Sequence, residues 1–301
     1  MDSVKIIEIK KSVFEDNNLD ADNLRRELRL KGVFLLNLMS SPGSGKTTTL
    51  IQTINRIKDK IRVAVMEADI DSDVDAVKIK EATGIPSIQL HTGGMCHLDA
   101  EMTRQGLDNM PLEDVDLVIL ENVGNLVCPA EFDTGSSCNA MILSVPEGHD
   151  KPLKYPLMFS VCDVVVVNKM DVQPYFDFDL EKCKEYIRMR NPKARVIPIS
   201  AKTGEGVDEF AAALEDAHSG LQAFRIVSLV GSAHQDGVDL GGEHEPDVHP
   251  AQRRGFERLQ ERLRRNEVRG LEVDVFPCVV EKPLVSHLDD GPARVGLVRH
   301  Y

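Results

Sequence analysis

The chain carries an excess of negative charge and has no long apolar run. Its 301 residues include 49 Asp and Glu against 36 Lys and Arg, which gives a formal net charge of −13. A surface with this charge repels a phosphate backbone, so the composition argues against nucleic-acid binding as the main role. No apolar segment approaches the roughly 20 residues that a membrane-spanning helix needs. Residues 1–11 alternate apolar and charged side chains and lack the apolar centre of a signal peptide.

Lysine nearly disappears in the last part of the chain. Residues 221–301 contain 1 Lys and 10 Arg, whereas residues 1–220 contain 16 Lys and 9 Arg. This change in usage predicts a main domain over 1–220 and a C-terminal extension over 221–301. The extension is interpreted either as a partner-docking or metal-accessory segment, or as a poorly ordered tail or a segment acquired by fusion or by a shifted reading frame. Its composition favours the second interpretation, and no site is assigned to it.

A glycine-rich loop follows the apolar run of residues 33–39. Residues 40–47 read SSPGSGKT, so Ser40 stands where the pattern G-x-x-x-x-G-K-[ST] has its first glycine. A strand, a glycine turn and a helix start together aim backbone N–H groups and a positive helix end at phosphate. Lys46 is predicted to neutralise the β- and γ-phosphates, and Thr47 to bind Mg²⁺. The predicted phosphate-binding residues are Gly43, Ser44, Gly45, Lys46, Thr47 and Thr48.

A second motif indicates which base is bound. The apolar run 163–167 ends in Asn168-Lys169-Met170-Asp171, an N-K-x-D sequence. The carboxylate of Asp171 can accept both N1–H and N2–H of guanine, a pair of donors that adenine does not offer. Asn168 can read the O6/N7 edge, and the stem of Lys169 can lie along the ring. A third segment, Ser200-Ala201-Lys202, follows an apolar run and can offer a backbone N–H to O6. Together with the glycine-rich loop, these motifs predict GTP as the ligand.

Acidic residues end two further apolar runs, 62–66 and 116–120. Glu121 is expected near the Mg²⁺ ion and its waters, with the Gly124 N–H near the γ-phosphate. Asp69 is predicted to bind Mg²⁺ or to position the attacking water, with Asp75 as a switch-loop candidate. The predicted catalytic residues are therefore Lys46, Asp69 and Glu121. Hydrolysis of GTP is expected to be slow because no arginine finger can be assigned.

The order of elements predicts an α/β fold of the P-loop NTPase type. Apolar runs alternate with helical patterns, which indicates a mostly parallel central sheet flanked by helices. Ligands of such folds bind at the carboxyl ends of the strands, where all these motifs fall. Strands are expected near 33–39, 62–67, 87–90, 116–121, 140–145, 163–168 and 195–199, and helices near 21–31, 46–57, 73–83, 99–109, 178–190 and 207–217.

Cys96 and His97 are adjacent and combine two kinds of side chain that bind Zn²⁺ and Ni²⁺. Cys128 lies just beyond Gly124, so it is expected to approach the γ-phosphate side of the nucleotide. The spacing alone does not show that Cys96 and Cys128 meet, and a buried cysteine beside a surface histidine is the plain alternative. Because a metal site requires reduced thiols and the chain has six cysteines in all, the cytoplasm is the expected compartment.

Three segments resemble the HypB family, the nickel-incorporation GTPases of [NiFe]-hydrogenase maturation. They read GMCHLDA at 94–100, ENVGNLVCPAEFD at 121–133 and EGHDKPLKYP at 147–156, and the resemblance covers about residues 20–218. It implies a GTP-hydrolysing nickel metallochaperone that forms a nucleotide-dependent homodimer, in which Lys151 or Lys154 helps to close the dimer. It further implies a HypA-type nickel accessory protein and the hydrogenase large subunit as partners. The implied Ni²⁺ or Zn²⁺ ligands are Cys96, His97 and Cys128.

Two alternatives differ from this interpretation in their metal motif or their chemistry. A UreG-type urease GTPase would carry a Cys-Pro-His motif, but Cys128-Pro129 is followed here by Ala130. A non-enzymatic metal-binding module, in which nucleotide only locks a dimer, would share all the motifs. Residues 1–23 lack the cysteine motif and the histidine-rich run of many HypB proteins, so nickel storage is not expected.

Overall fold

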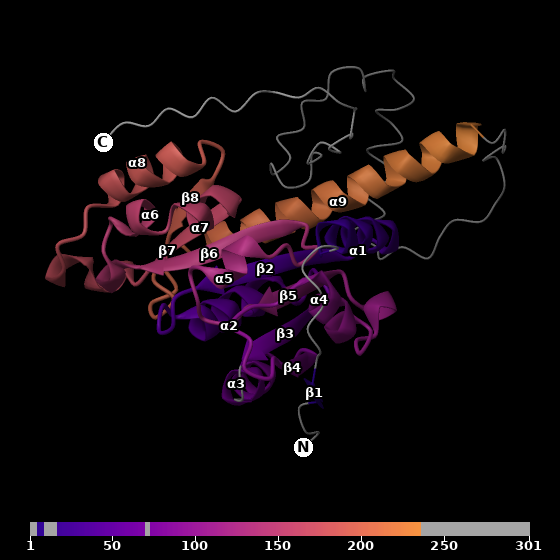
Figure 1. Cartoon of the computed structure of the whole chain (residues 1–301), viewed down its shortest axis with the longest axis horizontal. Helices are drawn as coiled ribbons and strands as arrows, with labels where there is room; N and C mark the ends of the chain where they lie inside the picture. The colour runs from indigo at the N-terminus through magenta and orange to yellow at the C-terminus, as the bar shows by residue number, and fades with distance from the viewer. Residues whose placement is uncertain (1–4, 9–16, 70–72, 236–301) are drawn as a thin grey trace, which may run out of the picture.

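The computed structural model describes residues 5–8, 17–69 and 73–235. Most of the predicted C-terminal extension, residues 236–301, lies outside the described residues. Within them, eight parallel strands form one sheet in the order β1-β4-β3-β5-β2-β6-β7-β8, with helices on both faces (Figure 1). This confirms the predicted fold class. The strands are β1 (Lys5–Glu8), β2 (Phe34–Ser40), β3 (Val63–Asp69), β4 (Ser87–His91), β5 (Leu117–Glu121), β6 (Cys138–Ser144), β7 (Val164–Asn168) and β8 (Arg195–Pro198).

The helices pack on the sheet because its central strands are apolar on both faces. Every residue of β2 is buried, and its side chains alternate between two clusters on opposite faces. One face is covered by α2, α3 and α9, the other by α1, α4, α7 and α8. The helices are α1 (Asn17–Lys31), α2 (Lys46–Ile57), α3 (Val74–Thr83), α4 (Ala100–Leu107), α5 (Cys128–Glu131), α6 (Lys151–Lys154), α7 (Pro156–Val161), α8 (Leu180–Arg190) and α9 (Val207–Gln235).

The predicted strands and the first five predicted helices are confirmed, with boundaries that differ by at most four residues. The structure adds strand β1, which pairs with β4, and the short helices α5, α6 and α7, each of which has Pro near its start. Their four to six residues are too short to show a helical period in the sequence. The described residues also form the 3₁₀ turns η2 (Leu112–Asp114), η3 (Val145–Glu147) and η4 (Met170–Tyr175).

The last helix differs most from its prediction. The sequence predicts a helix over 207–217, but α9 continues to Gln235 and passes position 220 without a break. The expected end was wrong, because the helix continues well beyond the predicted pattern. The boundary between the two predicted domains stays a prediction. No described helix, α9 included, is both long and apolar enough to cross a membrane.

Candidate nucleotide and metal site

The glycine-rich loop joins β2 to α2 at the carboxyl edge of the sheet. Gly43 and Gly45 have φ of 73° and 99°, a left-handed backbone that glycine adopts without strain. A Cβ on Gly45 would lie 2.5 Å from Nδ2 of Asn168, so this glycine also permits a close approach. Gly45 caps α2 without a side-chain hydrogen bond, which leaves the first N–H groups of the helix to an anion. Lys46 donates to Oγ of Ser40 at 3.0 Å, so the serine that replaces the first glycine serves as an acceptor.

Asn168 connects the base motif to the phosphate loop. Its Nδ2 donates to the Ser44 carbonyl at 2.9 Å, and its Oδ1 accepts from the backbone N–H of Ala201 at 3.0 Å and of Lys169 at 2.7 Å. The side chain of Asn168 therefore links the phosphate loop, the N-K-x-D segment and the segment 200–202. The sequence had instead suggested that this side chain contacts the base. In the segment predicted to offer a backbone N–H to guanine O6, the Ala201 N–H donates to Asn168 in this structure.

The other two residues of this motif are positioned by side-chain contacts. Oδ1 of Asp171 accepts a hydrogen bond from Oγ of Ser200 at 2.8 Å, which orients the carboxylate predicted to bind guanine. Lys169 is the one described non-glycine residue with positive φ, 64°, and its Nζ donates to the Gly43 carbonyl at 2.7 Å. Lys169 therefore spans from the end of β7 to the phosphate loop.

Three carboxylates meet at the ends of β3 and β5. Glu67, Asp75 and Glu121 each bring an oxygen within 4.8 Å of the others, and Glu67 and Glu121 are 4% and 1% exposed. Burial raises the pKa of Glu67 to about 8, with the neighbouring Glu121 as the next cause. Burial also raises the pKa of Glu121 to about 7, which the charge of Lys46 partly offsets.

This cluster differs from the predicted ion site in one member. Asp69, predicted to bind Mg²⁺, does not belong to the cluster, whereas Glu67, two residues earlier on β3, does. Glu67 and Glu121 pair in register between β3 and β5, so the side chain of Glu67 reaches the predicted site of Glu121. The acidic residue inside an otherwise apolar strand was the available signal. Within the described residues, Oε2 of Glu67 and Oε2 of Glu121 are buried without a hydrogen-bond partner, an arrangement that suits a divalent cation.

The structure brings the three predicted thiol and imidazole ligands together. Cys96 and His97 lie in the loop after β4 and Cys128 begins α5, yet their ligand atoms lie within 4.8 Å of one another. His97 is buried and its ring stacks on Phe132, with centroids 3.6 Å apart and planes at 20°. Contact with Cys96 and burial raise the pKa of Cys128. Cys138 lies elsewhere, buried in the core at the start of β6.

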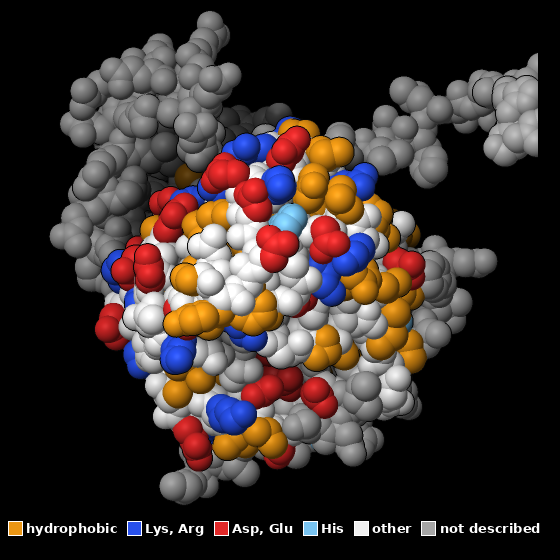
Figure 2. All heavy atoms as spheres, turned by 90° about the vertical axis from the view of Figure 1, so that its left-hand side faces the viewer, with side chains coloured by type: hydrophobic (Ala, Val, Ile, Leu, Met, Phe, Trp, Pro, Cys, Tyr) orange, Lys and Arg blue, Asp and Glu red, His pale blue; other side chains and the backbone are white. Residues whose placement is uncertain are grey.

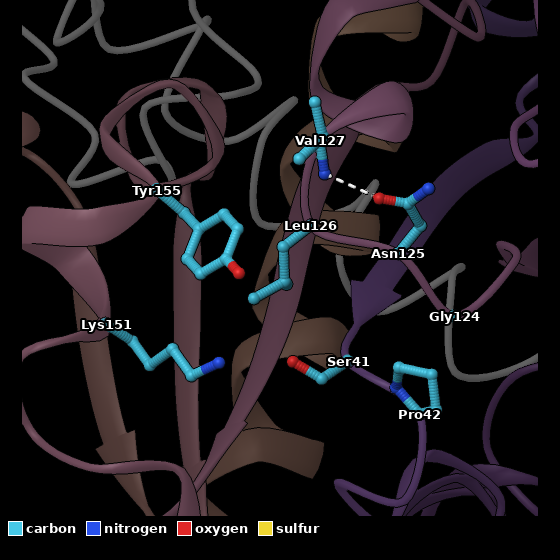
Figure 3. A pocket seen from close by; sticks show the side chains of 8 residues that line it. All are labelled: Ser41, Pro42, Gly124, Asn125, Leu126, Val127, Lys151 and Tyr155. Carbon is cyan, nitrogen blue, oxygen red and sulfur yellow. Dashed lines mark hydrogen bonds between the residues drawn. The ribbon is translucent and has the colours of Figure 1, made fainter.

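A cleft of about 350 Å³ lies between the phosphate loop and the loop that leads to Cys128. Figure 3 shows Lys151 and Ser41 pointing into this space from opposite walls, with Leu126 between Tyr155 and Ser41. Residues 124–127 form one wall, and Cys128 follows directly. Oγ of Ser41 also donates to Glu147 at 2.5 Å, and Nζ of Lys151 lies 3.9 Å from the same carboxylate. Figure 2 views the left-hand side of Figure 1 and shows acidic, basic and apolar side chains mixed on that face.

Comparison with known proteins identifies the family. Residues 34–198 match the model of the CobW/HypB/UreG nucleotide-binding domain. The chain is 46% identical over 215 residues to hydrogenase maturation factor HypB of Escherichia coli strain K12, a match that spans 71% of this chain and 74% of that relative. The chain belongs to the HypB family.

Other HypB proteins agree with this assignment. The hydrogenase/urease maturation factor HypB of Helicobacter pylori is 36% identical over 69% of this chain and 86% of its own length. A crystal structure of H. pylori HypB in complex with nickel matches with a TM-score of 0.64 at 36% identity, over 68% of this chain and 95% of that one. HypB of Archaeoglobus fulgidus matches with a TM-score of 0.63 and 36% identity, over 68% of this chain and 100% of that one. The domain match therefore includes all three predicted thiol and imidazole ligands and the glycine-rich loop, and it ends just before the predicted guanine-contacting segment Ser200-Ala201-Lys202.

Proposed function

We propose that this protein is a GTP-hydrolysing nickel metallochaperone that supports nickel insertion into [NiFe]-hydrogenase. The observation that carries the proposal is the single loop after β5: its residues 124–127 line the cleft beside the phosphate loop, and the next residue is Cys128, a proposed metal ligand. A ligand in the cleft therefore contacts the backbone that positions the metal ligand.

The phosphate loop would bind the GTP phosphates through the N–H groups of Gly43–Thr48 and the ammonium group of Lys46. Thr47 is proposed to bind Mg²⁺ together with carboxylates of the cluster Glu67, Asp75 and Glu121, while Asp69 stays a predicted ligand. These residues would hold the Mg²⁺ ion, which would supply positive charge beside the phosphates during hydrolysis. Asp171 would accept from guanine, and Lys202 lies beside the Ala201 backbone that contacts Asn168.

Glu121 is proposed to manage the attacking water in hydrolysis. The residue is buried at the end of β5 and belongs to the carboxylate cluster, which would place it beside the Mg²⁺ ion and the attacking water. Burial raises the pKa of Glu121, and the nearby charge of Lys46 favours the carboxylate form. Turnover is expected to be slow because the chain's motifs supply no arginine finger.

Nickel is treated as cargo. Three ligands from Cys96, His97 and Cys128 would leave a coordination position for a group that takes the metal, and the same set also suits Zn²⁺. If GTP and GDP place residues 124–127 differently, then they set two different affinities for the metal. Reciprocal linkage requires that the metal in turn changes the preference for the two nucleotides.

The proposal includes assembly and transfer partners. A nucleotide-dependent homodimer would place two such sites near one axis, with Lys151 or Lys154 at the closing surface. A HypA-type nickel accessory protein and the hydrogenase large subunit are the proposed partners for transfer. The proposed compartment is the cytoplasm, where thiols stay reduced.

The proposal is tested by Ni²⁺ binding and sedimentation with GDP and then with a non-hydrolysable GTP analogue. Wild type is compared with Cys96→Ala and, as a matched control, with Cys138→Ala, which removes a thiol outside the ligand cluster. Dimerisation with the analogue and a change in Ni²⁺ affinity that only Cys96→Ala removes would support the proposal. Nucleotide binding with no change in either property would overturn it.

A separate assay addresses catalysis. Release of GDP over several turnovers, dependent on Mg²⁺ and lost in Lys46→Ala, is expected of a GTPase. Binding of GTP without any release of GDP would leave a non-enzymatic module in which the nucleotide only locks a dimer.

A further inference from the structure

Helix α1 precedes the residues that match the CobW/HypB/UreG domain model, yet it contacts both loops that carry the proposed metal ligands. The domain match begins at residue 34, whereas α1 spans Asn17–Lys31. The helix packs along α4, which follows the loop of Cys96 and His97 (Figure 1). Its buried polar residues reach the loop that follows Cys128 as well.

Asn17, the first residue of α1, bridges the two loops with one side chain. Its Oδ1 accepts from the backbone N–H of Ala100 at 2.9 Å, three residues after His97. Its Nδ2 donates to the backbone carbonyl of Asp133 at 3.1 Å, five residues after Cys128. The side chain is 6% exposed, so water competes little for these two hydrogen bonds.

Arg25 holds the second loop from two turns further along the helix. Its guanidinium group binds both oxygens of Asp133, at 2.6 and 2.7 Å, and donates to the Ser136 carbonyl at 2.8 Å. The loop lies so close to α1 that a Cβ on Gly135 would be 2.9 Å from the Leu24 side chain. This residue has φ of +76°, so both its backbone and its contacts favour glycine.

The braced loop also carries the aromatic ring that orients the imidazole ligand. Phe132, next to Asp133, stacks on His97. On the other side, Glu27 of α1 accepts from Arg104 of α4 at 2.6 Å. A shift of α1 would therefore move the surroundings of all three metal ligands relative to one another.

We propose that Asn17 and Arg25 are positioning residues of the metal site, which hold the Cys96–His97 loop and the Cys128 loop at the spacing that coordination requires. Groups that orient metal ligands typically change affinity by about ten- to a hundredfold when they are removed. The inference rests on the proposed function, because it assumes that Cys96, His97 and Cys128 bind the metal.

The chain offers matched controls for both residues. Asn17→Ala is compared with Asn18→Ala and Arg25→Ala with Arg26→Ala, since Asn18 and Arg26 are exposed neighbours on the same helix. The measurements are Ni²⁺ affinity, the thiolate-to-Ni²⁺ charge-transfer spectrum and GDP affinity of the full chain. Asn17→Ala and Arg25→Ala should weaken Ni²⁺ binding about tenfold and change the spectrum, while GDP affinity stays within about twofold. The control variants should match wild type in all three.

A gentler pair covers the case in which a truncated variant does not fold. Asp133→Asn and Asp22→Asn each remove one carboxylate partner of Arg25. Only Asp133 belongs to the loop that follows Cys128, since Asp22 lies on α1 itself. The inference requires a weaker Ni²⁺ affinity and an altered spectrum in Asp133→Asn alone.

Cys128→Ala separates the two possible failures. If Cys128→Ala binds Ni²⁺ as wild type does, then the proposed metal site is wrong. If Cys128→Ala loses binding while Asn17→Ala, Arg25→Ala and Asp133→Asn behave like their controls, then the metal site stands and the positioning role is overturned.

Discussion

The nucleotide half of the site and the metal half are built in different ways. The nucleotide half lies at strand ends and is shaped largely by backbone: two left-handed glycines, an uncapped helix start and the Asn168 brace. The metal half depends on side chains of two loops that are far apart in sequence and that α1 holds in place. Backbone motifs are local and are readable in sequence, whereas a site assembled from loops requires the tertiary structure.

The largest expected effect comes from breaking the nucleotide half alone. Lys46→Ala removes the cation predicted at the β- and γ-phosphates, and GTP turnover should fall by at least about a hundredfold. Ni²⁺ affinity without nucleotide should stay at the wild-type value because Lys46 does not belong to the thiol and imidazole cluster. Steady-state phosphate release and Ni²⁺ titration measure the two effects. A loss of Ni²⁺ affinity in the same variant would show that the halves are not separable.

The reverse experiment breaks the metal half. Cys96→Ala should lower Ni²⁺ affinity by more than about a hundredfold, beyond the range for an outer-shell group. GDP affinity should not change, because the glycine-rich loop and the guanine motif keep their contacts. Parallel titrations with Ni²⁺ and GDP provide the comparison. Unchanged Ni²⁺ binding would rule out Cys96 as a ligand.

Two glycines sharpen the claim that backbone shapes the nucleotide half. Gly45→Ala forces a Cβ into a left-handed residue and to within 2.5 Å of Asn168, so it should cost about 1–3 kcal/mol and weaken GDP binding. Gly43→Ala has the same backbone strain but nothing within 4 Å, so its loss of stability should be smaller. Denaturant unfolding and GDP titration test the order. Equal losses would mean that contact with Asn168 has no role.

The buried carboxylates make the stability of the protein without Mg²⁺ or nucleotide depend on pH. The folded protein raises the pKa of Glu67 from 4.5 to about 8, so it binds this proton more tightly than the unfolded chain does. The stabilisation that protonated Glu67 contributes is therefore complete below about pH 4.5, and it is lost as the pH rises towards 8. Thermal unfolding of Glu67→Gln should show a shallower decline than wild type between about pH 5 and pH 8. Glu81→Gln, on the exposed side of α3, is the control and should keep the wild-type slope.

The fold and the nucleotide motifs could be predicted from the sequence because apolar runs and glycine turns are local signals. The sequence places Glu121 at a strand end but assigns no role to Glu67, whose approach to Glu121 follows from the register between β3 and β5. It also misses the role of Asn168 as a brace, since a hydrogen bond to Ser44 joins residues 124 positions apart.

The metal ligands show a different limit. Adjacent Cys96 and His97 indicate a metal by their chemistry, but their approach to Cys128 depended on family resemblance until the structure brought them together. The contribution of α1 left no signal at all, because one asparagine and one arginine on a helix are ordinary residues. Their role depends on hydrogen bonds to residues that lie 83 to 116 positions away in the sequence.

The most direct test of the central claim is a linkage measurement. The ratio of affinities for GDP and for a non-hydrolysable GTP analogue is determined with and without Ni²⁺, in wild type and in Cys96→Ala. If the loop after β5 couples the two halves, then Ni²⁺ changes this ratio in wild type and leaves it unchanged in Cys96→Ala. The same ratio with and without Ni²⁺ in wild type would contradict nucleotide-gated metal binding.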